Sequence, residues 1–259
     1  SDVKVLQPRQ LAQLPHAPLF WILLLAASLR VAFFLQVRGE PTFTVPQWDE
    51  AVYDEMARSV ARGHGIGLDK AYFFGPLYAY ALGLIYAVTG SCTTCAILLQ
   101  HVLGVLLAGL TYALARRWFG RAESLLAAGL LAAAGAQVFF EGKLLMEVLV
   151  SVLLAGSLLL ITGAQSRPGP VRLLCAGLLL GLAATGRPTL LMLAPLALIP
   201  LLRSPAQSGR HLLVALAVYA AGVVAAPAAT LVRNLVVEGT PVLITSSGGF
   251  NFFAGNARD

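Results

Sequence analysis

Charged side chains are scarce in this sequence: they make up 12% of its 259 residues, whereas hydrophobic residues make up 58%. Soluble domains carry about 25% charged residues, so this composition excludes an ordinary soluble domain. The mean hydropathy of +0.79 indicates that much of the apolar surface faces lipid. We therefore expect an all-α polytopic membrane protein embedded in a lipid bilayer.

Several catalytic and metal-binding motifs are also missing. Cys92 and Cys95 form a CxxC, but no second pair or nearby histidine completes a zinc site, so we expect small packing residues. His101 lies within an apolar run, where a hydrogen bond to a neighbouring helix is more common than metal binding. The sequence contains no HExxH, P-loop or GxSxG motif. We assign no metal ligands.

The formal net charge is +6, yet the lysines and arginines are scattered at the ends of apolar segments. They form no basic stripe and are not interleaved with aromatic residues. This distribution is typical of membrane topology signals, so we do not expect nucleic acid as a partner.

Four of the twelve acidic residues gather in one stretch, residues 48–66. They are Asp49, Glu50, Asp54 and Glu55. Apolar residues recur in this stretch at helical spacing and two glycines follow, which predicts an amphipathic helix on a bilayer surface. Asp49 is a candidate general base, with Glu50 beside it. The alternative is that Asp49 only caps the helix, and Thr44 with Gln47 offers a competing cap.

Apolar segments along the chain predict about seven transmembrane helices. They are residues 19–37, 92–115, 125–140, 144–163, 173–185, 190–202 and 212–232. Residues 73–89 are apolar but short, and the positive-inside rule favours a re-entrant or interfacial helix for them. Arg30 lies within the first span, where we expect it to face protein or to snorkel outward.

This topology brings residues 38–89, which form the first extracytoplasmic loop, and three later junctions to one side of the membrane. Glu141 and Glu147 lie at one junction and Arg187 at a Gly-Arg-Pro break, with Lys143 also near headgroup depth. Arginine suits phosphate binding. Interfacial anchoring remains the alternative for the two cations, and a favourable charge at a helix start for Glu147. Residues 233–259 begin a further extracytoplasmic loop.

Six pieces, in order along the chain, resemble bacterial members of the GT-C superfamily of polytopic glycosyltransferases. The closest group is the dolichyl-phosphate-mannose protein mannosyltransferases and lipid A aminoarabinose transferases. The pieces are WDEAVYDEMARSVARGHGI, FGPLYAYALGLIYAVTG, LARRWFGR, FFEGKLLMEVL, GLAATGRPTLLML and RNLVVEGTPVLITSSGGFNFFAGN. Phe74 and Gly75 depart from the family, which often has Arg or His and then Pro there. Residues 1–259 are then expected to form a GT-C-like transmembrane catalytic module, as a piece of a longer chain.

The resemblance implies an enzyme that moves a sugar from a polyprenyl-phosphate carrier to a lipid, glycan or protein acceptor, with inversion. The acceptor group is a hydroxyl or a phosphate, on the periplasmic face of a bacterial plasma membrane. Asp49 is then the general base, and Glu50 and Glu147 assist by hydrogen bonding or by holding a divalent cation. The other substrate-binding residues implied are Tyr53, Glu141, Lys143, Arg187, Arg233 and Asn234.

Two other functions remain open at this point. One is a polytopic transporter or flippase, although the sequence shows no clear internal repeat and its charge lies at one face. The other is a catalytically silent protein that binds polyprenyl lipid.

Overall fold

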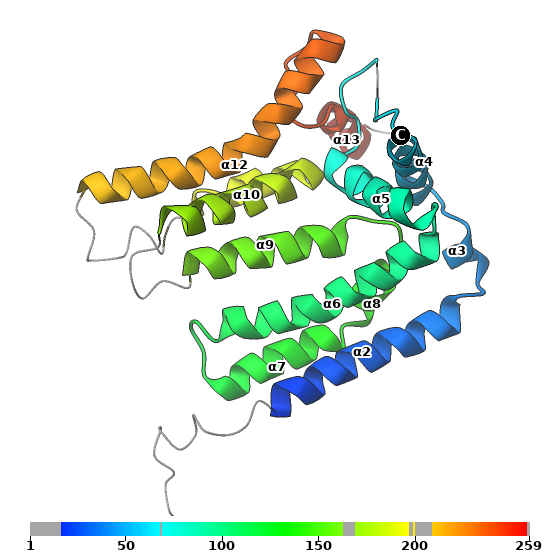
Figure 1. The fold of residues 1–259 in the computed structure, drawn as a ribbon, viewed down its shortest axis with the longest axis vertical. Helices are drawn as coiled ribbons and strands as arrows, with labels where there is room; N and C mark the ends of the chain where they lie inside the picture. Colours follow the sequence, from blue (N-terminus) through cyan, green and yellow to red (C-terminus); the bar gives the residue numbers. More distant parts are fainter. Residues whose placement is uncertain (1–16, 68, 163–168, 197–198, 200–208, 258–259) are drawn as a thin grey trace, which may run out of the picture.

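The computed structural model describes residues 17–67, 69–162, 169–196, 199 and 209–257, and every regular element in those ranges is helical (Figure 1). Six helices lie side by side: α2 (Ala17–Val37), α6 (Thr93–Ala115), α7 (Arg121–Ala132), α9 (Glu147–Thr162), α10 (Pro170–Gly186) and α12 (Gly209–Glu238). The expected all-α class is confirmed.

Three of these helices, α2, α6 and α12, are long and apolar enough to cross a membrane. A fourth candidate span consists of α7 and the short α8 (Gly135–Glu141), which bend by 51° at their junction. We expected one helix at residues 125–140, but the chain forms two helices there, so that prediction is wrong. Helices α9 and α10 are apolar and shorter, and residues 190–202 fall partly in the 3-10 helix η1 (Pro188–Leu193) and partly outside the described residues. The total of seven spans stays a prediction.

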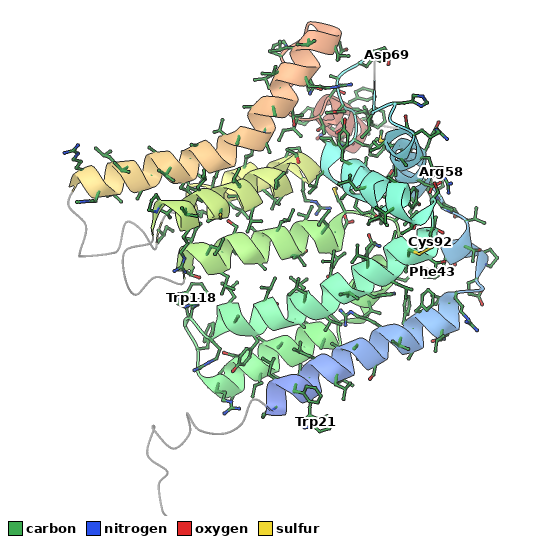
Figure 2. All side chains as sticks on the ribbon, viewed as in Figure 1. Trp21, Phe43, Arg58, Asp69, Cys92 and Trp118 are labelled. Atoms are coloured by element: carbon green, nitrogen blue, oxygen red, sulfur yellow. A yellow bond between two sulfur atoms is a disulfide. The ribbon has the colours of Figure 1, made fainter. Side chains whose placement is uncertain are left out.

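Four further helices gather at one end of these six: α3 (Pro41–Thr44), α4 (Asp49–Ala61), α5 (Pro76–Thr89) and α13 (Ser247–Asn256) (Figure 1). Figure 2 shows Cys92, Phe43 and Arg58 toward this end and Trp118 at the opposite end of α6. The basic turn that contains Trp118 therefore lies away from α4. This is the separation that the positive-inside rule predicts.

The predicted helix in residues 48–66 is present as α4, which packs along α5. Tyr53 and Ala57 of α4 are buried in a cluster with Tyr78 and Leu82 of α5. The helices approach closely at Gly83, where a Cβ would meet the Val60 side chain. This packing fixes α4 and so the position of its first turn, which holds Asp49 and Glu50.

The structure does not use Asp49 as a helix cap. Asp49 is the first residue of α4, and the N-cap position belongs to Trp48, which makes no side-chain cap hydrogen bond. Thr44 ends α3, and its hydroxyl donates to the Glu40 carbonyl instead of capping α4. Both capping alternatives are therefore wrong.

The first turn of α6 carries a disulfide, and the middle of the helix carries a buried histidine. Cys92 and Cys95 are joined by a disulfide at its first turn, so the expectation of simple packing residues is wrong. His101 lies 3.1 Å, from Nδ1 to Oε2, from Glu141 of the neighbouring α8, which confirms the predicted hydrogen bond between helices.

Residues 233–259, which we expected to begin a loop, are partly helical. Helix α12 continues to Glu238, past residue 232, and α13 follows after a short segment. The continuation turns Arg233 and Asn234 into residues of a helix rather than of a loop. Their side chains consequently face the segments packed beside the end of α12.

Candidate functional site

A cavity of about 410 Å³ lies where α4, the start of α9 and the break after α10 meet, and we call it the α4–α9 cavity. Asp49 and Tyr53 of α4, Glu147 of α9 and Arg187 after α10 all line it. Phe250 of α13 lies on its wall. Four of the predicted site residues, from three distant parts of the chain, are therefore neighbours.

Glu147 and Arg187 form an ion pair within this cavity. Arg187 Nη2 donates to Glu147 Oε1 at 2.9 Å, and the two side chains are 51% and 32% exposed. Arg187 is extended, with φ −130° and ψ 94°, because the following proline disfavours helical backbone before it. Glu147 Oε2 is buried and has no hydrogen-bond partner among the described residues. Only Oε1 of this carboxylate is therefore paired among the described residues.

The start of α5 holds the Arg187 turn in place. Gly75 packs against the end of α10, where a Cβ at this position would lie 2.6 Å from the Thr185 carbonyl oxygen. Only glycine fits so close to the backbone of α10.

Asp49 is exposed and makes no hydrogen bond or ion pair within the described part of the chain. It lies in the first turn of α4, at the positive end of the helix dipole. Tyr53, one turn later, is 2% exposed. The pKa of Tyr53 is raised to about 12, first by burial and then by the charges of Glu147 and Asp49, while Arg187 acts to lower it. The same four groups therefore interact electrostatically.

A second cavity of about 480 Å³ adjoins the first, and we call it the α3–α8 cavity. Asp49 lines both cavities, and Glu50 and Lys143 line the second. Glu50 Oε1 accepts a 2.9 Å hydrogen bond from the backbone N–H of Leu144, and Glu50 Oε2 lies 3.5 Å from Lys143 Nζ. Lys143 also donates to the Thr42 carbonyl. Both oxygens of Glu50 thus have partners, whereas the Asp49 side chain has none among the described residues.

Glu141 lies in neither cavity. It is fully buried and receives two hydrogen bonds of 2.7 Å from Arg30, at Oε1 and Oε2. Arg30 thus faces protein, as expected. Gln100 donates to the Glu141 carbonyl at 2.8 Å and to the Lys143 carbonyl at 2.7 Å. This buried network holds the junction that carries Lys143.

Arg233 and Asn234 also lie outside both cavities. Arg233 stacks over Tyr72, 4.0 Å from the ring centroid, and donates to the carbonyl oxygens of Lys70, Ile66 and Gly67. Asn234 is fully buried and joins α12 to the tail. In this structure both residues hold loops together.

Several lining residues were not predicted from the sequence. Phe73 and Phe250 line the α4–α9 cavity and touch each other, with ring centroids 5.9 Å apart. Phe139 and Phe140 line the α3–α8 cavity and are both more than 40% exposed. Phe139 and Phe140 lie in an ordinary apolar run, so the sequence gave no signal that would distinguish them from lipid-facing residues.

A divalent cation would find few protein ligands here. Among the described residues, no group of three or more His, Cys, Asp or Glu side chains is placed to hold a metal ion. Asp49 and Glu147 are the two carboxylates that line the α4–α9 cavity.

Comparison with known proteins gives one family. Residues 70–232, more than half of the chain, match the family described as dolichyl-phosphate-mannose-protein mannosyltransferase. No curated protein and no solved structure matches the chain significantly. The matched range includes Glu147 and Arg187, whereas Asp49 and Glu50 precede it.

Proposed function

Because the chain belongs to the dolichyl-phosphate-mannose-protein mannosyltransferase family, whose members are membrane glycosyltransferases of the GT-C type, we propose that it transfers a sugar from a polyprenyl-phosphate carrier. The acceptor is a hydroxyl or phosphate group on a lipid, glycan or protein. Its oxygen attacks the anomeric carbon as the bond from that carbon to the phosphate oxygen breaks, and the configuration inverts. The polyprenyl phosphate leaves with the bonding electrons.

One observation carries this proposal: an unpartnered carboxylate, Asp49, shares a cavity with the Glu147–Arg187 pair. A transfer of this kind needs a base for the acceptor and positive charge for the departing phosphate, held in fixed geometry. The α4–α9 cavity offers both kinds of group within one space.

Asp49 is the general base in this proposal. A base must be ionised near neutral pH and must reach the proton that it removes. The exposed position of Asp49 between the two cavities supports the second condition.

Arg187 stabilises the phosphate that leaves. Its guanidinium is half exposed and makes one hydrogen bond to Glu147, so further N–H donors can reach a phosphate oxygen. Glu147 keeps the guanidinium oriented through its Oε1. Lys143 adds positive charge at the neighbouring cavity.

Glu50 and Tyr53 position the base rather than react. Glu50 ties α4 to the Leu144 backbone, and Tyr53 anchors the next turn of α4 beneath the cavity. The exposed Phe139 and Phe140 provide an apolar wall for the isoprenoid chain. The positive-inside distribution of the basic turns supports a site on the non-cytoplasmic face. The proposed location is a bacterial plasma membrane.

The test is a transfer assay with the purified full-length protein in lipid nanodiscs. It is supplied with a panel of radiolabelled polyprenyl-phosphate sugars and an extract of membrane lipids, glycans and proteins. We expect one donor to be consumed and a product of inverted anomeric configuration, identified by mass spectrometry and NMR. Donor movement across the bilayer without any glycosidic product would instead favour the transporter.

A further inference from the structure

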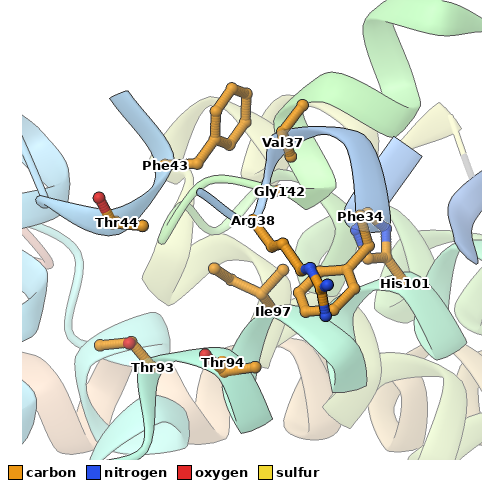
Figure 3. A pocket seen from close by; sticks show the side chains of 10 residues that line it. All are labelled: Phe34, Val37, Arg38, Phe43, Thr44, Thr93, Thr94, Ile97, His101 and Gly142. Carbon is orange, nitrogen blue, oxygen red and sulfur yellow. The ribbon is translucent and has the colours of Figure 1, made fainter. Parts of the chain in front are cut away.

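A third cavity, of about 220 Å³, lies between the end of α2 and the start of α6 (Figure 3). It shares no lining residue with the two cavities of the proposed transfer site. Its wall comes from α2, α3, α6 and the junction after α8. We call it the α2–α6 cavity.

His101 lines this cavity and is only 5% exposed. Its Nδ1 lies 3.1 Å from Glu141 Oε2, and because an ionised carboxylate can only accept, Nδ1 carries the hydrogen. The other ring nitrogen, Nε2, is buried and has no partner among the described residues. A buried polar atom without a partner is costly, so Nε2 points to a ligand group that it can bond. In the neutral ring Nε2 accepts, which suits a hydroxyl.

Arg38 supplies positive charge to the same cavity. Its side chain extends into the space in Figure 3, and within the described residues it makes no hydrogen bond or ion pair. None of the described residues that line the cavity is Asp or Glu, and the nearby Glu141 is already paired with Arg30. The cavity is therefore suited to an anion.

Three threonines complete the polar lining: Thr44 of α3, and Thr93 and Thr94 of α6. Thr93 and Thr94 lie at the start of their helix. They are the first two residues of α6, where backbone N–H groups have no partner within the helix and the helix dipole is positive. The disulfide between Cys92 and Cys95 brackets both threonines and fixes the turn that presents them. The remaining wall is largely apolar, from Phe34, Val37, Phe43 and Ile97.

We propose that the α2–α6 cavity binds a phosphate group that also carries a hydroxyl, separately from the sugar donor. The guanidinium of Arg38 and the first turn of α6 bind the anionic oxygens, and His101 Nε2 accepts from the hydroxyl. Two sources share this chemistry: the headgroup of an anionic phospholipid and free monohydrogen phosphate. The apolar wall accommodates the upper part of a lipid chain.

The test counts bound ligand on the purified full-length protein by native mass spectrometry, without sugar donor. The probes are phosphatidylglycerol, which has headgroup hydroxyls, phosphatidylcholine, which has none, and inorganic phosphate. Arg38→Gln and Thr94→Val are compared with Arg62→Gln, which removes an exposed arginine outside the cavity. We expect Arg38→Gln to weaken phosphatidylglycerol binding by about fivefold or more, because a charge-assisted bond is lost. Thr94→Val weakens it less, and Arg62→Gln leaves it unchanged.

The outcomes separate the two sources. Tight phosphatidylglycerol binding that inorganic phosphate does not displace identifies a lipid headgroup, and displacement by phosphate at similar affinity identifies the free ion. Equal binding of phosphatidylcholine and phosphatidylglycerol, or equal effects of Arg38→Gln and Arg62→Gln, would overturn the proposal. The readout needs no sugar transfer, so its failure is distinct from failure of the proposed enzymatic activity.

Discussion

Arg187 donates a 2.9 Å hydrogen bond to Glu147, its partner across the α4–α9 cavity, although 40 positions separate the two residues in the chain. The pair brings one positive and one negative charge into a space that Asp49 also lines. A phosphate entering this cavity would bind the guanidinium donors that Glu147 does not occupy. The pair therefore offers a direct test of whether the cavity handles phosphate.

Replacing Arg187 by Gln is expected to reduce kcat/KM for the polyprenyl-phosphate donor by about 10- to 100-fold, because a charge-assisted hydrogen bond to the leaving phosphate is lost. Stability changes little, since an exposed ion pair contributes about 0–1 kcal/mol. Arg58→Gln is the matched control, because it breaks a partly exposed ion pair with Asp54 outside the cavity. Steady-state kinetics and thermal unfolding check both parts, and equal kcat/KM for the two variants would contradict a phosphate role for Arg187.

Tyr53 is expected to make the protein sensitive to alkali. Its pKa is raised to about 12 in the folded chain, chiefly by burial, whereas an unfolded tyrosine titrates near about 10. Between these values the unfolded chain loses a proton that the folded chain keeps. Stability from this group is therefore complete below about pH 10 and is lost as the pH rises toward about 12.

Tyr53→Phe removes this titration. Unfolding free energies measured in detergent at stepwise alkaline pH should fall less steeply for the variant than for the natural protein over that window. The difference should reach roughly 3 kcal/mol. Parallel curves for the two proteins would show that the phenol is not buried beside the two carboxylates.

Much of the fold follows from local sequence patterns. The stripe of Val52, Met56 and Val60 predicts α4, and long apolar runs predict α2, α6 and α12, because helical periodicity is a property of neighbouring residues. The bend between α7 and α8 was not predicted. Residues 125–140 contain no proline, and the small residues around the bend gave no distinct signal.

The sequence predicted which residues line the candidate site better than it predicted how they are arranged in space. Topology alone placed Asp49, Glu147 and Arg187 on one side, and the structure brings them into one cavity. Glu141 differs because its partner, Arg30, lies 111 positions away, and no spacing rule links the two. Arg233 likewise depends on a stacking partner, Tyr72, that only the folded chain reveals.

The Arg30–Glu141 pair is expected to be essential for stability. Arg30→Met leaves a buried carboxylate without its bidentate partner, which costs about 3–5 kcal/mol. The double variant Arg30→Met with Glu141→Leu removes both charges and should recover a large part of that loss. Thermal unfolding of the single and double variants in detergent measures this coupling. A double variant less stable than Arg30→Met would contradict it.

Asn234 is expected to fix the tail through its amide group. Its Nδ2 donates to the Val242 carbonyl at 2.9 Å and to the Ile244 carbonyl at 3.2 Å. Asn234→Asp replaces this donor with an oxygen facing two carbonyls, at a cost of about 1–3 kcal/mol or more. Limited proteolysis should then cut the segment at residues 240–246 faster. Asn256→Asp, at an exposed position, is the control and should leave the cleavage rate unchanged.

The most direct test of the proposed enzyme is sugar transfer by Asp49→Asn, with Glu55→Gln, an exposed acid on the same helix but outside both cavities, as the matched control. Loss of a general base should lower the transfer rate by about 100- to 10,000-fold. Donor binding should be retained, and Glu55→Gln should transfer at the natural rate. Transfer by Asp49→Asn at the rate of the natural protein would contradict the assignment of Asp49 as the base.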